Sequence, residues 1–109
     1  MRLSAYRNMW VIAMFDLPVD TKAARRAYTL FRKALLKDGF AKMQYSVYVR
    51  HCASIENAEV HEGRVSDALP PDGEVRLVRI TDKQYERMRI FWGKRRQAPA
   101  PAPAQLELF

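Results

Sequence analysis

The sequence predicts an α+β domain in which four strands and two helices follow one another in the order βαββαβ. Residues 10–15 form an unbroken apolar run with the length and composition of a strand. Apolar residues recur at helical spacing between Lys22 and Lys37. Residues 70–73, Pro-Pro-Asp-Gly, are a strong turn signal before another strand-like segment. A chain of 109 residues is long enough for one such domain with one core.

The first strand is apolar on both of its faces, so we expect it in the middle of a sheet that is covered on both sides. The strand ends at Asp16, two residues before Pro18. A lone acid at the end of a buried strand is a frequent position for a metal ligand or a catalytic acid. Alternatively, Asp16 caps the following turn or helix. The spacing alone leaves both interpretations open.

The first helix is expected at Lys22–Lys37, with Asp20 or Thr21 as its N-cap and Gly39 in the left-handed conformation after it. Two strands, a second helix, a fourth strand and a short helix are then expected at residues 40–44, 46–52, 54–69, 74–80 and 81–89. A tight turn or bulge near Tyr45 joins the second and third strands. Residues 90–92 are a candidate for a fifth, short strand.

This order of elements is that of a ferredoxin-like domain, an antiparallel sheet with two helices on one face. The other face needs cover because the first strand is apolar on both sides, and no remaining segment is large enough to provide it. We therefore predict a twofold homodimer. The domain is expected at residues 1–96, followed by a Pro/Ala-rich linker at 97–104 and a strand-like segment at 105–109.

The chain is strongly basic: 19 Lys and Arg against 12 Asp and Glu give a net charge of +7. Such a balance favours a polyanionic partner, a nucleic acid above all. The first helix carries six cations with no acid between them: Lys22, Arg25, Arg26, Arg32, Lys33 and Lys37. Arg76 and Arg79 add to this charge and suit phosphate contacts that do not depend on base sequence. For any single residue, a solvated basic surface is the alternative.

Other functional classes find little support in the sequence. The first residues do not resemble a signal peptide, no apolar run reaches transmembrane length, and we expect a cytoplasmic protein with no membrane partner. Cys52 is the only cysteine, so neither a disulfide framework nor a thiolate metal site is expected. His51, His61 and Ser46 lack partners at a spacing typical of metal sites or nucleophilic catalysis.

Three motifs, in this order and at these intervals, resemble the CRISPR-associated protein 2 family: Phe15-Asp16-Leu17-Pro18, Gln44-Tyr45-Ser46-Val47-Tyr48 and Ile80-Thr81-Asp82-Lys83-Gln84-Tyr85. The resemblance implies a ferredoxin-like homodimer that acts in the adaptation stage of CRISPR antiviral defence. Such a dimer bridges the CRISPR-associated integrase and holds the DNA fragment that becomes a new spacer. The resemblance also implies a magnesium-dependent endonuclease acting on RNA or double-stranded DNA.

Carried over by motif, the family's metal-binding and catalytic aspartate is Asp16. Its nucleic-acid-binding residues fall on Lys42 and Tyr48, and on Arg25 or Arg26. A single carboxylate is a poor magnesium site, because Mg²⁺ usually takes one or two carboxylates together with water and phosphate oxygens. In a dimer whose axis passes near the end of the first strand, two copies of Asp16 would share one ion, Mg²⁺ or another divalent cation.

The C-terminal residues 105–109, Gln-Leu-Glu-Leu-Phe, admit two interpretations. Leu106, Leu108 and Phe109 would bind a partner as a strand added to a sheet edge of the second protomer or of the integrase. Alternatively, the segment resembles the peptide that docks on the bacterial sliding clamp.

The sequence keeps several functions open. A non-catalytic scaffold needs only basic charge and dimer geometry, whereas a nuclease depends on Asp16. An RNA-binding domain of the same topology would usually carry glycines in an aromatic-rich third strand, and these are absent here. A nuclease toxin of similar fold would use much the same residues.

Overall fold

The computed structural model describes residues 7–94 of the chain. Within them, the strands are β1 (Arg7–Asp16), β2 (Ala41–Gln44), β3 (Val47–Ser54) and β4 (Glu74–Thr81), and the helices are α1 (Lys22–Lys37), α2 (Ile55–Asp67) and α3 (Asp82–Glu86). The α+β class and the order of the elements are as predicted. None of these helices combines the length and apolar character needed to cross a membrane.

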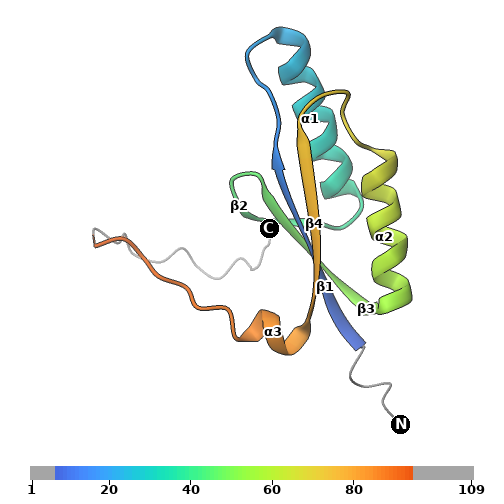
Figure 1. The fold of residues 1–109 in the computed structure, drawn as a ribbon, viewed down its shortest axis with the longest axis vertical. Helices are drawn as coiled ribbons and strands as arrows, with labels where there is room; N and C mark the ends of the chain where they lie inside the picture. The colour runs from blue at the N-terminus through green and yellow to red at the C-terminus, as the bar shows by residue number, and fades with distance from the viewer. Residues whose placement is uncertain (1–6, 95–109) are drawn as a thin grey trace.

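The four strands form one antiparallel sheet in the order β2-β3-β1-β4. β1 lies between β3 and β4, so the prediction of a central first strand is confirmed. Helices α1 and α2 lie side by side along the sheet, and α3 follows the end of β4 near the start of β1 (Figure 1).

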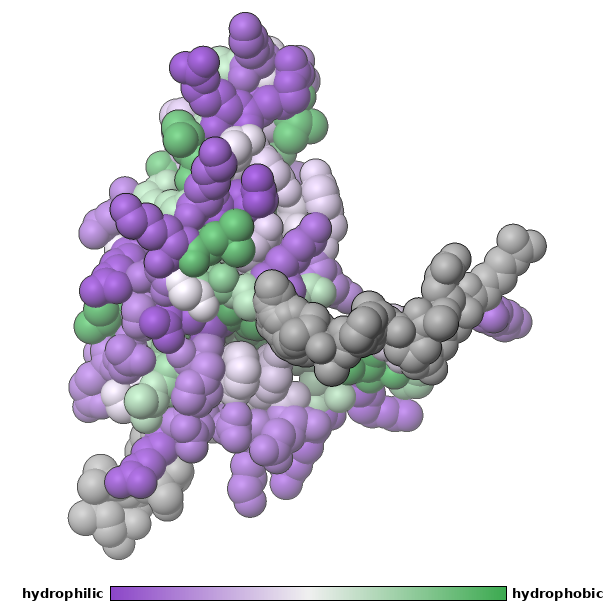
Figure 2. Space-filling model, turned by 180° about the vertical axis from the view of Figure 1, so that it is seen from behind, coloured by the Kyte–Doolittle hydropathy of each residue, from purple (hydrophilic) through white to green (hydrophobic). Residues whose placement is uncertain are grey.

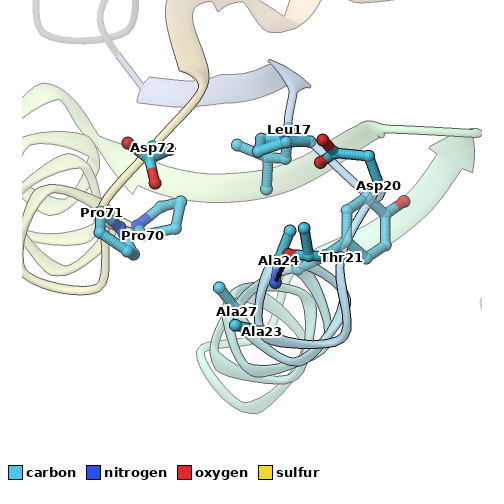
Figure 3. A pocket seen from close by; sticks show the side chains of 11 residues that line it. Leu17, Asp20, Thr21, Ala23, Ala24, Ala27, Pro70, Pro71 and Asp72 are labelled. Atoms are coloured by element: carbon cyan, nitrogen blue, oxygen red, sulfur yellow. Dashed lines mark hydrogen bonds between the residues drawn. The ribbon is translucent and has the colours of Figure 1, made fainter.

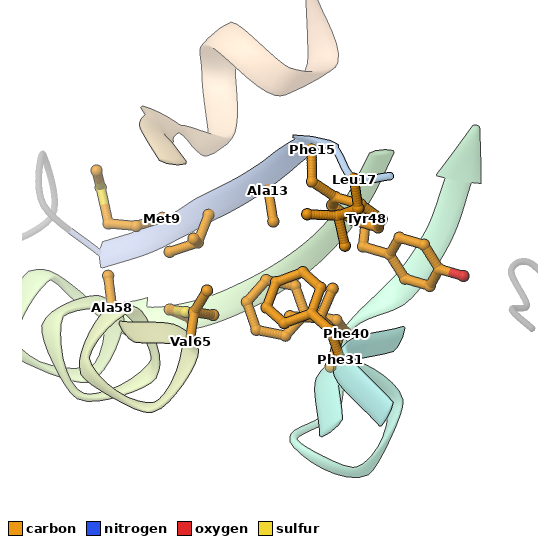
Figure 4. Packing of buried hydrophobic residues seen from close by; sticks show 12 residues of the cluster. Met9, Ala13, Phe15, Leu17, Phe31, Phe40, Tyr48, Ala58 and Val65 are labelled. Carbon is orange, nitrogen blue, oxygen red and sulfur yellow. The ribbon is translucent and has the colours of Figure 1, made fainter. Parts of the chain in front are cut away.

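The hydrophobic core lies between the sheet and the helices α1 and α2 (Figure 4). Successive side chains of a strand point to opposite faces, and alternate residues of β1 supply one wall of the core: Met9, Val11, Ala13 and Phe15. The helices supply the facing wall with Phe31, Leu35, Ala58 and Val65. The remaining β1 residues, Trp10, Ile12, Met14 and Asp16, consequently face away from these two helices.

Helix α1 has the bounds that its pattern predicts. Of the two N-cap candidates it uses Thr21, whose Oγ1 accepts a hydrogen bond of 3.0 Å from the backbone N–H of Ala24. At its other end Gly39 has φ +91°, a left-handed conformation that lets the chain turn and place Phe40 in the core.

Two features at the end of the described chain differ from the predictions. Helix α3 ends at Glu86 rather than near Arg89. Residues 90–92 do not form a strand, because no ladder partner lies beside them in the described chain, and the side chain of Phe91 is 77% exposed. The predicted linker at 97–104 and the segment at 105–109 lie outside the described residues.

Helix α3 covers one end of the sheet face that α1 and α2 leave open. The indole Nε1 of Trp10 donates a 2.7 Å hydrogen bond to Asp82, and the indole stacks on the ring of Tyr85 at 3.8 Å. The expectation that no remaining segment could cover this face was therefore wrong for this end. Farther along, Met14 and Val78 remain 36% and 40% exposed.

Asp38, which follows the last residue of α1, links that helix to α2. Its carboxylate accepts 2.8 Å hydrogen bonds from Arg64 and from the ring Nδ1 of buried His61, and its backbone carbonyl accepts one of 2.9 Å from Arg50. Burial raises the pKa of Asp38, but the hydrogen bonds from Arg64 and His61 outweigh it and hold the pKa below the ordinary 3.8.

We expect Asp38→Asn to lower the free energy of unfolding by about 2 kcal/mol at neutral pH, since charge-assisted hydrogen bonds are lost. A lowered folded-state pKa stabilises the fold above the unfolded pKa, and this stabilisation disappears as the pH falls through the folded value. The difference between wild type and variant should thus shrink below pH 3.8. Urea unfolding from pH 7 to pH 2 measures it, with the exposed Asp67→Asn as control. A difference that is unchanged down to pH 2 would contradict the role of the ionised Asp38.

Candidate active site

Asp16 is the last residue of β1 and is exposed. Its neighbour Phe15 is anchored in the core, where its ring lies 5.1 Å from that of Phe31 and its backbone N–H donates a 3.0 Å hydrogen bond to the carbonyl of Ser46. Because side chains alternate along a strand, this anchor directs Asp16 to the opposite, open face of the sheet. Within residues 7–94, the Asp16 carboxylate has no hydrogen bond or ion pair. Asp16 is therefore available for a ligand rather than used as a cap.

The structure places a second carboxylate directly opposite Asp16. Glu74, the first residue of β4, is the cross-strand partner of Asp16, so both side chains share the open face. Arg76, two residues along β4, lies on the same face and donates a 3.1 Å hydrogen bond to Glu74. The ion pair with Glu74 raises the pKa of Arg76. Asp16, Glu74 and Arg76 thus form one polar cluster on the open face. Asp16 and Glu74 are called the carboxylate pair below.

Gly73 allows the two strands to approach each other closely at this point. Its φ is +100°, and a Cβ there would lie 2.6 Å from the Leu17 side chain and 2.9 Å from the backbone oxygen of Asp16. No other residue type allows this approach without strain. Glycine at this position consequently permits the register in which Glu74 lies opposite Asp16.

A hollow of about 420 Å³ lies on the helix side of the same loops (Figure 3). It is bounded by the loop after β1, the first turns of α1 and the loop before β4, with mainly apolar lining from residues such as Leu17, Ala23, Ala27, Pro70 and Pro71. Asp16 and Glu74 are not part of its lining. The hollow is thus separate from the carboxylate pair.

The predicted basic residues of α1 lie at the surface. Arg25 and Arg26 are exposed and line a shallow hollow together with Lys33. Arg25 also donates a 3.1 Å hydrogen bond to the carbonyl of Val19, in the loop that follows Asp16. Hydrophilic side chains cover most of the molecular face in Figure 2. The exposed cations of α1 can bind phosphates without reading bases.

The two residues predicted from the second motif have different environments. Lys42 is exposed, with its ammonium 5.9 Å from the ring centre of Tyr45. Tyr48 is only 2% exposed and stacks on Phe15 at 5.6 Å, inside the core (Figure 4). The ring of Tyr48 cannot contact a nucleic acid in this arrangement, because it faces the helices. The exposed aromatic of this motif is Tyr45, in the turn between β2 and β3.

Arg76 and Arg79 also differ, although both lie on β4. Arg79 faces the helices and makes two hydrogen bonds, of 2.6 and 2.8 Å, to the carboxylate of Glu62 on α2. Its charge is thus neutralised within the domain, and Arg79 acts as a structural residue here rather than a free phosphate ligand. Arg76 is on the open face, where its side chain is 70% exposed and forms an ion pair with the exposed Glu74. The predicted partner-binding residues Leu106, Leu108 and Phe109 lie outside the described residues.

The donor set suits a hard divalent cation. Within residues 7–94, no three His, Cys, Asp or Glu side chains come together around one point. The Asp16 carboxylate nevertheless provides exposed oxygen donors without a competing partner, and Mg²⁺ commonly binds through one or two carboxylates and completes its shell with water and phosphate oxygens. The residues present therefore fit such an ion.

Glu74 and Tyr45 are the two site residues that sequence reasoning missed. Glu74 follows the Pro-Pro-Asp-Gly turn, and that signal marks the start of a strand but does not reveal which residue of β1 it pairs with. Tyr45 occupies the predicted tight turn, where its exposure could have been inferred.

Fold and site together define a small basic α+β protein with a carboxylate at the end of its central strand. The sequence model of the family "CRISPR associated protein Cas2" matches residues 9–88. The chain is 61% identical over 101 residues to the "CRISPR-associated endoribonuclease Cas2" of Parvibaculum lavamentivorans, covering 93% of this chain and 100% of the relative. It is 46% identical over 108 residues to the protein of the same name from Flavobacterium psychrophilum, covering 99% and 94%.

A solved structure described as "Crystal structure of cas2" superposes with a TM-score of 0.53 at 20% identity, covering 86% of this chain and 95% of that chain. At this identity the superposition supports the fold alone. The family match and the two relatives show that the chain belongs to the Cas2 family of CRISPR-associated proteins.

Proposed function

We propose that this chain is a CRISPR-associated endonuclease that hydrolyses phosphodiester bonds of RNA or double-stranded DNA through Asp16 and a divalent cation such as Mg²⁺. The observation that carries the proposal is the exposed, unpaired Asp16 carboxylate at the end of the buried strand β1, in a member of the Cas2 family. The relatives' printed name, endoribonuclease, favours RNA as one substrate.

The side chains at the site have different roles in this proposal. Asp16 would hold the cation, and the basic residues of α1 with Lys42 and Arg76 would bind phosphates of the nucleic acid. A bound divalent cation supplies positive charge that stabilises the negative charge developing on the phosphodiester during hydrolysis. Asp16 requires no proton transfer for this role, so its contribution is positioning and charge.

The active form is a ferredoxin-like homodimer. The strand order β2-β3-β1-β4 supports the topology, and the exposed apolar residues of the open face, Met14 and Val78, support pairing with a second copy. With the twofold axis near the end of β1, two Asp16 carboxylates face one another across the interface. Sedimentation equilibrium tests this: a dimer that Met14→Glu converts into a folded monomer is expected, and an unchanged dimer would contradict the surface.

Asp16→Asn is expected to lower the rate of cleavage at least about a hundredfold, since removal of one preorganised electrostatic group costs that much. The measurement uses labelled RNA and duplex DNA, with Mg²⁺ or with a chelator, and scores cleavage and binding in the same samples. Asp20→Asn, which removes an exposed acid from the adjacent loop, is the matched control. Equal cleavage by wild type and Asp16→Asn would overturn the nuclease proposal.

A non-catalytic scaffold is the second candidate, favoured by the exposed cations of α1, which need no metal to bind a duplex. In this role the dimer bridges the CRISPR-associated integrase and holds the fragment that becomes a new spacer. Binding that survives Asp16→Asn, without cleavage by either protein, supports the scaffold. Arg25→Gln with Arg26→Gln should then weaken duplex binding.

A further inference from the structure

The carboxylates of Asp16, the last residue of β1, and Glu74, the first residue of β4, lie side by side on the open face of the sheet. Asp16 and Glu74 are directly opposed in the ladder. Directly opposed residues of antiparallel strands have Cβ atoms about 5 Å apart, and like charges at such positions are destabilising. Arg76 pairs with Glu74 only, and its hydrogen bond leaves Asp16 without a partner in the described chain.

The backbone enforces this arrangement. Gly73 approaches Leu17 and the backbone oxygen of Asp16 so closely that a residue with a Cβ does not fit there, and this close approach brings the start of β4 beside the end of β1. The ladder then continues through Phe15 with Val75 and Met14 with Arg76. Neither carboxylate can move to the other face without breaking this register, because side chains alternate along both strands.

We infer that Glu74 is a second carboxylate ligand of the divalent cation held by Asp16, and that Arg76 neutralises Glu74 when the ion is absent. The inference rests on the proposed metal-dependent function, and it deepens that function by giving each chain two carboxylates for the ion. A cation between the two side chains removes the repulsion that the register imposes. Arg76, on the same face, is then free to contact a phosphate oxygen of the bound nucleic acid.

The test measures metal binding by the full-length protein without nucleic acid. Mn²⁺ serves as the probe, since carboxylate sites that suit Mg²⁺ also bind Mn²⁺. Free Mn²⁺ is followed by electron paramagnetic resonance, and Mg²⁺ is added as a competitor. The variants are Asp16→Asn, Glu74→Gln, Glu74→Asp and Glu86→Gln. Glu86 is an exposed glutamate of α3, near the opposite end of β1, and controls for the loss of one negative charge.

We expect Glu74→Gln to weaken Mn²⁺ binding about tenfold or more, as loss of groups in a metal site typically does. Glu74→Asp keeps the charge but shortens the reach, so it should also weaken binding, whereas Glu86→Gln should bind like wild type. Thermal unfolding followed by circular dichroism identifies any variant that fails to fold, and Glu74→Asp then decides in place of Glu74→Gln.

The outcomes separate the two proposals. If wild type binds no Mn²⁺, or if Asp16→Asn binds it equally well, the metal-dependent function itself fails. If Asp16→Asn weakens binding while Glu74→Gln does not, only the role of Glu74 fails. If Glu74→Gln weakens binding and Glu74→Asp does not, Glu74 acts through its charge alone, and the inference that it is a ligand is overturned.

Discussion

Tyr48→Ala is expected to lower the free energy of unfolding by about 4 kcal/mol, the usual range for truncating a buried aromatic residue. The ring is 2% exposed and is stacked on Phe15, with β1 on one side and the helices on the other. The variant leaves a cavity beside Phe15, the residue that directs Asp16 to the open face. Urea unfolding followed by circular dichroism measures the loss, and the proposed binding of a cation by Asp16 should weaken along with the fold.

Tyr48→Phe separates packing from surface contact. Burial raises the pKa of the Tyr48 phenol, although a hydrogen bond from Arg32 lowers it, so the group is neutral at pH 7. Removing only the hydroxyl should cost about 1 kcal/mol and leave nucleic-acid affinity unchanged. If Tyr48→Phe weakened nucleic-acid binding while the fold kept its stability, the residue would contact the ligand, as the motif implied.

Gly73→Ala is the second large effect, with an expected loss of about 3 kcal/mol from left-handed strain and steric overlap together. The added Cβ would lie 2.6 Å from the Leu17 side chain and 2.9 Å from the backbone oxygen of Asp16. The strand β4 must therefore move away from β1 at the position of the carboxylate pair. Chemical unfolding gives the loss of stability, and Mn²⁺ binding should weaken in parallel.

Gly63→Ala provides the matched control. Gly63 lies in α2, and a Cβ there would meet no heavy atom within 4 Å. In a helix, exchanging glycine for alanine stabilises by about 0.4–1 kcal/mol because the unfolded chain loses freedom. A Gly73→Ala variant as stable as wild type would show that β4 can begin elsewhere, and it would remove the reason for Glu74 to face Asp16.

Local patterns predicted much of the fold. The apolar run of β1 and the helical spacing of α1 each appear within one segment. Helix α1 has the expected bounds, and β1 ends at Asp16 as expected but begins at Arg7, three residues before the predicted start. In β3, Val47 and Val49 lie on one face and Tyr48 on the other, as the alternation of an extended strand requires. Alternation could not predict which face of β3 points into the hydrophobic core, because both faces of the strand are apolar.

Some residues of the candidate site could likewise be predicted from local sequence patterns, and others could not. Asp16 could be found from its place after an apolar strand, and the exposed cations of α1 from their spacing on one helix. Arg79 resembled Arg76 in the sequence, yet Glu62 on α2 pairs with Arg79, and only the packing of that helix on the sheet brings them together.

By itself, the sequence determined the elements, their order, the basic charge and the acid at the end of the first strand, since these depend on neighbours along the chain. Only the tertiary structure decided that Glu74 faces Asp16, that Tyr48 is buried and that Arg79 is neutralised. The physical reason is that strand register and burial follow from contacts between distant segments. The close approach of Gly73 to the end of β1 is one such contact, and local periodicity contains no information about it.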